Sequence, residues 1–227
     1  MKMSKLVWGM ALLLGFSAAQ AQEDSRNYDD HKIVSKDISV GNFTALDLSG
    51  VMSVFLTQGD KTAVKVEADE KVIDKVEIEA KDGTLYVKTK KGGLKNVKTM
   101  NVYITVTSLS KINNQLVGKL ETENTIKQAS LRYKSASVGN ASLQLDVEDL
   151  KVDIAAVGNT EFSGKAVNCE LDNTSIGNVR AGSLVVENMQ LTSTAIGNLE
   201  YYATNTKVVK STGIGKVTNK LKQEESK

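Results

Sequence analysis

A tripeptide that returns at a nearly constant interval constrains this chain more than any other feature. It is Val138-Gly139-Asn140, followed by Val157-Gly158-Asn159, Ile176-Gly177-Asn178, Ile196-Gly197-Asn198 and the altered form Ile214-Gly215-Lys216. Counted from the Val or Ile, the steps are 19, 19, 20 and 18 residues. A period near twenty that persists over half of a chain is typical of stacked structural repeats.

Each repeat also shows the alternation of a β-strand, because the positions five and seven residues before the Val or Ile are apolar and their neighbours are mostly polar. The column five residues before the Val or Ile contains Tyr133, Val152, Leu171, Leu191 and Val209. The column seven residues before it contains Leu131, Leu150, Cys169 and Met189, with Lys207 in the last copy. A unit of twenty residues cannot bury its own apolar face, so successive units must stack about 4.8 Å apart. The sequence therefore predicts an all-β fold, a parallel β-helix with rungs of about 19–20 residues.

The glycine and asparagine of the repeat have separate structural roles. We expect each glycine at a corner of a rung, where φ is positive and a Cβ would clash. The asparagine tolerates the same tight backbone, and its amide can hydrogen-bond its copy in the next rung. The predicted repeat residues are Gly139, Asn140, Gly158, Asn159, Gly177, Asn178, Gly197, Asn198 and Gly215. A Gly-Asn pair also suits a hairpin between antiparallel strands, but the fixed apolar columns favour the solenoid.

A second column, three residues before the Val or Ile, is expected to point inward and to pair polar side chains between rungs. Its members are Asn114, Ser135, Ile154, Asn173, Ser193 and Ser211. Upstream of the regular repeats, strand-like segments begin at Phe43 and include a hairpin around Asp82-Gly83. We expect these segments to form irregular first rungs that also cap one end of the solenoid.

The ends of the chain differ from the repeats. Residues 1–21 have the pattern of a signal peptide, with Lys2 and Lys5 before an apolar run and a cleavage site at Ala19-Gln20-Ala21. We predict a flexible segment over residues 22–40, one β-helix domain over 41–218 and a disordered charged tail over 219–227. No later stretch is apolar enough to cross a membrane, so the mature chain is expected to have no transmembrane segment.

Composition argues against several classes of function. The chain has 29 basic and 27 acidic residues, and removal of the two signal lysines leaves equal numbers, which gives no basis for nucleic-acid binding. His31 is the only histidine, so a histidine triad or a multi-histidine metal site cannot be built. Cys169 stands in an apolar column and is expected to be a buried, inert thiol. No nucleotide-binding or calcium-repeat motif is present, and we predict no metal and no cofactor.

The repeats, the opening Phe43 to Val51 with Gln58-Gly59-Asp60, and the closing Tyr201-Tyr202-Ala203 through Gly215 occur together in one order. In this order they resemble the head GIN domain family, named for auto-transporter adhesins of Bacteroides-like bacteria. The resemblance covers residues 41–218. It implies a right-handed β-helical domain that is exported, and it implies no established activity.

Three functions remain open at this point. The first, which we predict, is an exported, non-enzymatic binding protein of the cell envelope, in the periplasm or at the outer surface, with an envelope protein or surface glycan as partner. The second is a polysaccharide-active enzyme, in which Asp153 and Asp172 on adjacent rungs approach the carboxyl spacing of about 5–5.5 Å of a retaining glycosidase, with Tyr201 and Tyr202 as sugar-stacking aromatics. These aspartates are more simply explained as solvated carboxylates. The third is a periplasmic structural protein that assembles end to end.

Overall fold

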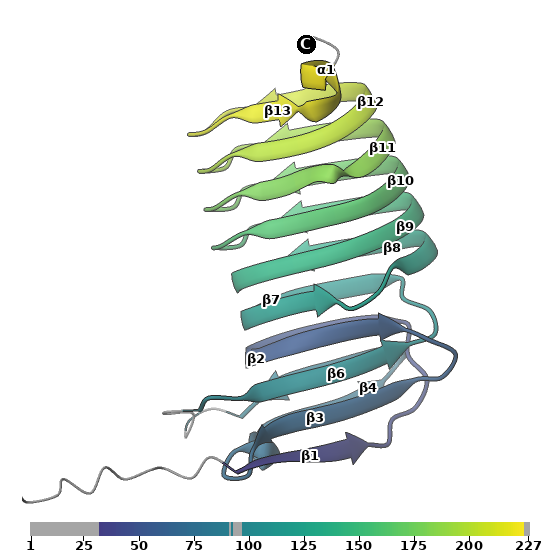
Figure 1. The fold of residues 1–227 in the computed structure, drawn as a ribbon, viewed down its shortest axis with the longest axis vertical. Coiled ribbons are helices and arrows are strands. Elements are labelled where there is room, and N and C mark those ends of the chain that lie inside the picture. The colour runs from purple at the N-terminus through teal and green to yellow at the C-terminus, as the bar shows by residue number, and fades with distance from the viewer. Residues whose placement is uncertain (1–31, 91, 93–96, 225–227) are drawn as a thin grey trace, which may run out of the picture. The chain divides into compact units, whose positions relative to one another are not determined.

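The computed structural model describes residues 32–90, 92 and 97–224. The predicted signal peptide, residues 22–31 and residues 225–227 lie outside the described residues. The described chain is almost entirely strand, and its strands join one sheet that winds into a solenoid (Figure 1). The prediction of an all-β parallel solenoid is therefore confirmed.

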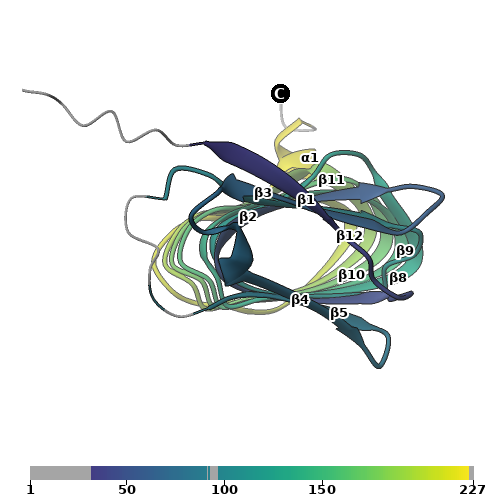
Figure 2. The same ribbon diagram turned by 90° about the horizontal axis from the view of Figure 1, so that it is seen from below.

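The regular part of the solenoid is built from parallel strands in sequence order. They are β7 (Lys111–Thr122), β8 (Ile126–Ser135), β9 (Val138–Ile154), β10 (Thr160–Asn173), β11 (Val179–Ser193), β12 (Leu199–Ser211) and β13 (Val217–Asn219). Seen end-on, the rungs are flattened rings with two long sides (Figure 2). In β10, residues 160–166 form the first side and residues 168–173 the second, and the Val-Gly-Asn tripeptides lie at the corner that precedes the first side.

The first rungs are irregular, as predicted. The strand β2 (Ala45–Gln58) pairs along its length with β7, and its other edge pairs with β5 (Thr84–Thr89) and β6 (Met100–Val106). Three antiparallel strands then close this end: β4 (Val76–Lys81) beside β5, β3 (Ala63–Asp69) beside β6, and β1 (Ile33–Ile38) beside β3. The short 3-10 helix η1 (Ile73–Lys75) joins β3 to β4. The pair β4–β5 is the predicted hairpin.

Two predictions about the ends are wrong within the described residues. The segment expected to be flexible contains β1, because its backbone finds a partner in β3. The tail expected to be disordered begins with Asn219 in β13 and continues as the helix α1 (Lys220–Glu224). The helix is held because Lys220 pairs with Glu200 at 3.1 Å and Leu221 donates its N–H to Asn219 Oδ1 at 3.2 Å.

The apolar columns fill the interior as predicted. Leu150, Cys169 and Met189 are stacked in register and buried. The polar inward column is also confirmed in the regular rungs, where Asn173 Nδ2 donates to Ser193 Oγ at 3.4 Å. In the last rung a bulge shifts the register, so that Val208 rather than Val209 lies opposite Leu191. Ser211, expected inside, is exposed because no rung covers it.

Candidate functional site

The Gly-Asn corner has the geometry that the repeat predicts. Gly158 and Gly177 have φ of 132° and 136°. A Cβ on Gly177 would stand 2.7 Å from the carbonyl carbon of Gly158 and closer still to its oxygen. The amides form a ladder, in which Asn159 Nδ2 donates to Asn140 Oδ1 at 3.3 Å and Asn178 Nδ2 donates to Asn159 Oδ1 at 3.2 Å. The corner is thus held by glycine at close backbone approach and by side-chain amides between rungs.

The Val or Ile of each tripeptide points away from the core. We call this column the aliphatic ridge, and its members lie in register on successive rungs with 47 to 72% of each side chain exposed in the regular repeats. They are Val51, Val117, Val138, Val157, Ile176, Ile196 and Ile214. Six steps of about 4.8 Å make the ridge about 29 Å long. A continuous exposed apolar stripe of this kind is a mark of an interaction surface.

The residues that flank the ridge along the chain are uncharged from Val138 to Ile196. Two positions before the Val or Ile of each regular repeat, the chain has Ala136, Ala155, Thr174, Thr194 and Thr212. Two positions after it, the chain has Asn140, Asn159, Asn178 and Asn198. No charged residue occurs in residues 135–143, 154–160, 173–179 or 193–199. Lys119 and Lys216 replace the asparagine at the two ends of this column. We call the part of this surface from Val138 to Ile196, which excludes both lysines, the uncharged edge.

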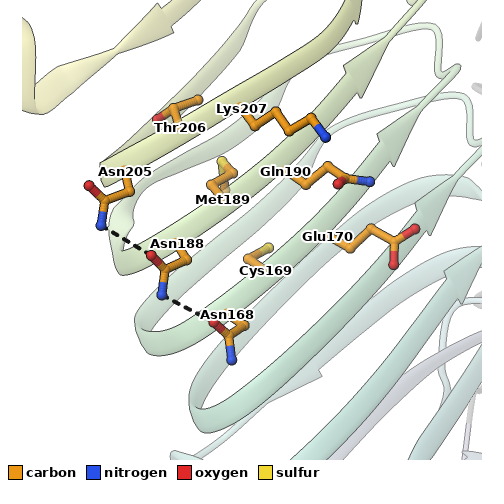
Figure 3. Close-up of a pocket in the computed structure, with 9 residues that line it drawn as sticks. All are labelled: Asn168, Cys169, Glu170, Asn188, Met189, Gln190, Asn205, Thr206 and Lys207. Atoms are coloured by element: carbon orange, nitrogen blue, oxygen red, sulfur yellow. Dashed lines mark hydrogen bonds between the residues drawn. The ribbon is translucent and has the colours of Figure 1, made fainter.

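A second ladder of amides lies at the opposite corner of the rung, between the two long sides (Figure 3). Asn168 Nδ2 donates to Asp149 at 2.8 Å, Asn188 Nδ2 to Asn168 Oδ1 at 3.2 Å, and Asn205 Nδ2 to Asn188 Oδ1 at 3.1 Å. An open groove of about 490 Å³ runs along this ladder. Its other wall is formed by Glu170, Gln190 and Lys207. This asparagine groove carries mixed charge, in contrast to the uncharged edge.

The structure brings together only two of the four residues considered for the enzymatic alternative. Asp153 and Asp172 are register partners on the second side, as predicted, and Asp153 accepts a hydrogen bond from Arg132 Nη2 at 2.9 Å. Tyr201 is buried in the core, so its predicted role as a surface aromatic is wrong. Tyr202 is partly exposed, but it lies on the first side beside Val185.

Cys169 offers no nucleophile. Its side chain is buried, and burial raises the pKa of the thiol to about 12, with a smaller contribution from the charge of Glu170. The thiolate that attacks substrates or binds metals is therefore not formed near neutral pH. Within the described ranges, no group of three or more His, Cys, Asp or Glu side chains is placed to hold a metal ion.

The order of the motifs along this solenoid matches one family. The family model described as "Putative auto-transporter adhesin, head GIN domain" matches residues 42–221. The chain belongs to this family. No curated protein matches the sequence.

Solved structures with the same fold come from Bacteroides and Parabacteroides species. A "putative adhesin" from Bacteroides fragilis NCTC 9343 is 25% identical, with a TM-score of 0.77 over 83% of this chain and 97% of that chain. A "putative adhesin" from Parabacteroides merdae ATCC 43184 is 19% identical, with a TM-score of 0.53 over 83% and 95% of the two chains. A "putative lipid binding protein" from Parabacteroides distasonis ATCC 8503 is 15% identical, with a TM-score of 0.52 over 83% and 98%. The last two similarities concern the fold.

Sequence reasoning missed the aliphatic ridge, although the signal was present. Asn173 and Ser175 point inward, and strict alternation then places Ile176 outward. The asparagine groove was missed because its corner breaks the alternation, with Val167 and Asn168 both exposed.

In the part of the chain that the structure covers, no helix is long and apolar enough to span a membrane.

Proposed function

We propose that this head GIN domain protein is an exported, non-enzymatic adhesin that works at the outer cell surface. The uncharged edge carries the proposal, because it presents a regular apolar ridge and an amide ladder over consecutive rungs. The pattern of residues 1–21 supports export. Membership of an adhesin family and the likeness to the Bacteroides fragilis protein support binding rather than catalysis.

A neutral surface glycan is the ligand class that fits this edge best. A charge-free surface has no ions to desolvate on binding, whereas a strongly charged ligand would lose hydration without compensation. The Val and Ile side chains can pack against the C–H faces of sugar rings. The side-chain amides of Asn159 and Asn178 each have two N–H donors and use one in the ladder, which leaves the other for a hydroxyl group.

Paired variants on and off the edge test this assignment. Val157→Ser combined with Ile176→Ser removes two adjacent ridge contacts that are about half exposed. If each contact contributes about 1 kcal/mol, binding to a neutral glycan should weaken roughly thirty-fold. The matched control is Val167→Ser combined with Val185→Ser, which changes exposed valines outside the edge.

Binding is measured on immobilised neutral and acidic polysaccharides, with envelope protein extracts as a separate arm. The proposal predicts saturable binding to a neutral polysaccharide that the ridge variant loses and the control keeps. Equal binding by all three proteins would remove the uncharged edge from the function. Binding only to acidic polysaccharides or only to protein would contradict the assigned ligand class.

A further inference from the structure

The last rung of the solenoid is only half built. The strand β13 pairs with residues 199–201 of β12, on the first side. The side chain of Asn219 extends this pairing to Ala203, because its Nδ2 donates to the Ala203 carbonyl at 2.9 Å and its Oδ1 accepts from the Ala203 N–H at 3.4 Å. Among the described residues, no strand pairs with the outer edge of β12 beyond this point. The second side therefore ends one strand short of the first.

The end of the core is open where that strand is missing. Val208 stands opposite Leu191 in the same inward column, yet Val208 is 48% exposed and Leu191 is 0% exposed. Thr206 stands opposite Met189, and its hydroxyl oxygen is buried with no hydrogen-bond partner among the described residues. The inward apolar side chain of Val208, left in solvent, favours the arrival of a covering segment.

The outward side chains of the same stretch are basic. Lys207 lies opposite Gln190 and Lys210 opposite Thr192, so no acidic residue faces them on the rung below. Neither lysine has a salt bridge within the described ranges. Lysines on an open edge discourage pairing with the same edge of a second copy, because like charges would lie opposite each other. A strand that carries acidic residues would instead be attracted.

We propose that the outer edge of β12 over residues 205–211 accepts one extended strand of a partner protein. The strand adds to the sheet by backbone hydrogen bonds, which is β-augmentation. Its apolar residues cover Thr206 and Val208, and its acidic residues, on the alternate positions, face Lys207 and Lys210. This site is distinct from the uncharged edge and would attach the adhesin to another envelope protein while the edge stays free.

A peptide with the sequence of β4 provides a defined probe. Val76–Lys81 alternates Val, Ile and Ala with two glutamates, which is the required chemistry. The blocked peptide is titrated into the isotope-labelled mature chain, and backbone amide NMR signals are followed. Two control peptides are used: one with both glutamates changed to lysine, and one N-methylated on alternate amides so that it cannot complete the sheet.

We expect the acidic peptide to bind at least tenfold more tightly than the lysine peptide, with shifts centred on residues 205–211. In the variant Lys207→Glu combined with Lys210→Glu, this preference should reverse. The N-methylated peptide should not bind. Absence of binding at millimolar peptide, equal binding of the acidic and lysine peptides, or binding of the N-methylated peptide would each overturn the proposal.

Discussion

Replacement of the corner glycine Gly177 by alanine tests how closely the rungs approach each other. The residue has φ of 136°, a region that costs a side-chain-bearing residue about 1–3 kcal/mol. The new Cβ would also stand 2.7 Å from the carbonyl carbon of Gly158, and overpacking of this kind costs about 1–3 kcal/mol more. Gly177→Ala should therefore lower the free energy of unfolding by about 2–6 kcal/mol, a large part of the stability of a typical domain.

Urea denaturation followed by circular dichroism gives this free energy, and two other glycines separate its causes. Gly83 has φ of 71° but nothing within 4 Å of its hypothetical Cβ, so Gly83→Ala should cost only about 1–2 kcal/mol. Gly41 is equally open and has no positive φ, so Gly41→Ala should change stability by less than about 0.5 kcal/mol. If Gly177→Ala cost no more than Gly83→Ala, the close stacking of the rungs would be refuted.

Three further predictions concern buried and paired side chains. Burial raises the pKa of the Cys169 thiol to about 12, above the value of roughly 8.5 in the unfolded chain. The contribution of this thiol to the free energy of unfolding is therefore full below about pH 8.5 and lost as pH rises from about 9 to 12. The urea midpoint should fall less over this pH range in Cys169→Ala than in the wild type, and equal falls would contradict the burial. Asn178→Ala removes hydrogen bonds to both neighbouring rungs of the corner ladder and should lower the free energy of unfolding by about 1–2 kcal/mol in the same urea assay. Asn205→Ala, at the end of the ladder in the asparagine groove, should lower it by about 0.5 kcal/mol. A larger loss for Asn205→Ala than for Asn178→Ala would refute the ladder. The half-exposed pair Arg132–Asp153 should contribute less than about 1 kcal/mol in a double-mutant cycle and weaken in salt, whereas a value above 2 kcal/mol would show a structural role.

The regular rungs could be predicted because one local pattern is repeated until it fixes the register. The column through Leu150, Cys169 and Met189 needs only alternation and a constant period, and both are visible in the sequence. The glycine corners follow for the same reason, since a residue without a Cβ recurs at the one place where the backbones approach most closely.

The ends could not be predicted because no repeat fixes them. The strand β1 forms through its antiparallel pairing with β3, a contact between segments about thirty residues apart that no periodicity marks. The helix α1 depends on Asn219 and on the pair of Lys220 with Glu200, which are single contacts. The bulge in β12 likewise could not be predicted, because alternation alone does not say which of the adjacent valines, Val208 or Val209, lies opposite Leu191.

The structural alternative, end-to-end assembly of identical copies, is less well supported by the surfaces at the two ends. The first side carries β1 at one end and β13 with α1 at the other, so each end is uneven between its two sides. Direct stacking of copies would bring these extra elements together before the second sides could pair. Analytical ultracentrifugation at high concentration should therefore show a monomer, and a concentration-dependent series of oligomers would contradict this view.

The location of the protein tests the adhesin proposal most directly. An epitope-tagged form is expressed in its host, and intact cells are treated with protease beside a periplasmic control protein. The proposal predicts that the tagged protein is digested on intact cells while the control is protected. Protection of both proteins until the outer membrane is opened would contradict a role in adhesion.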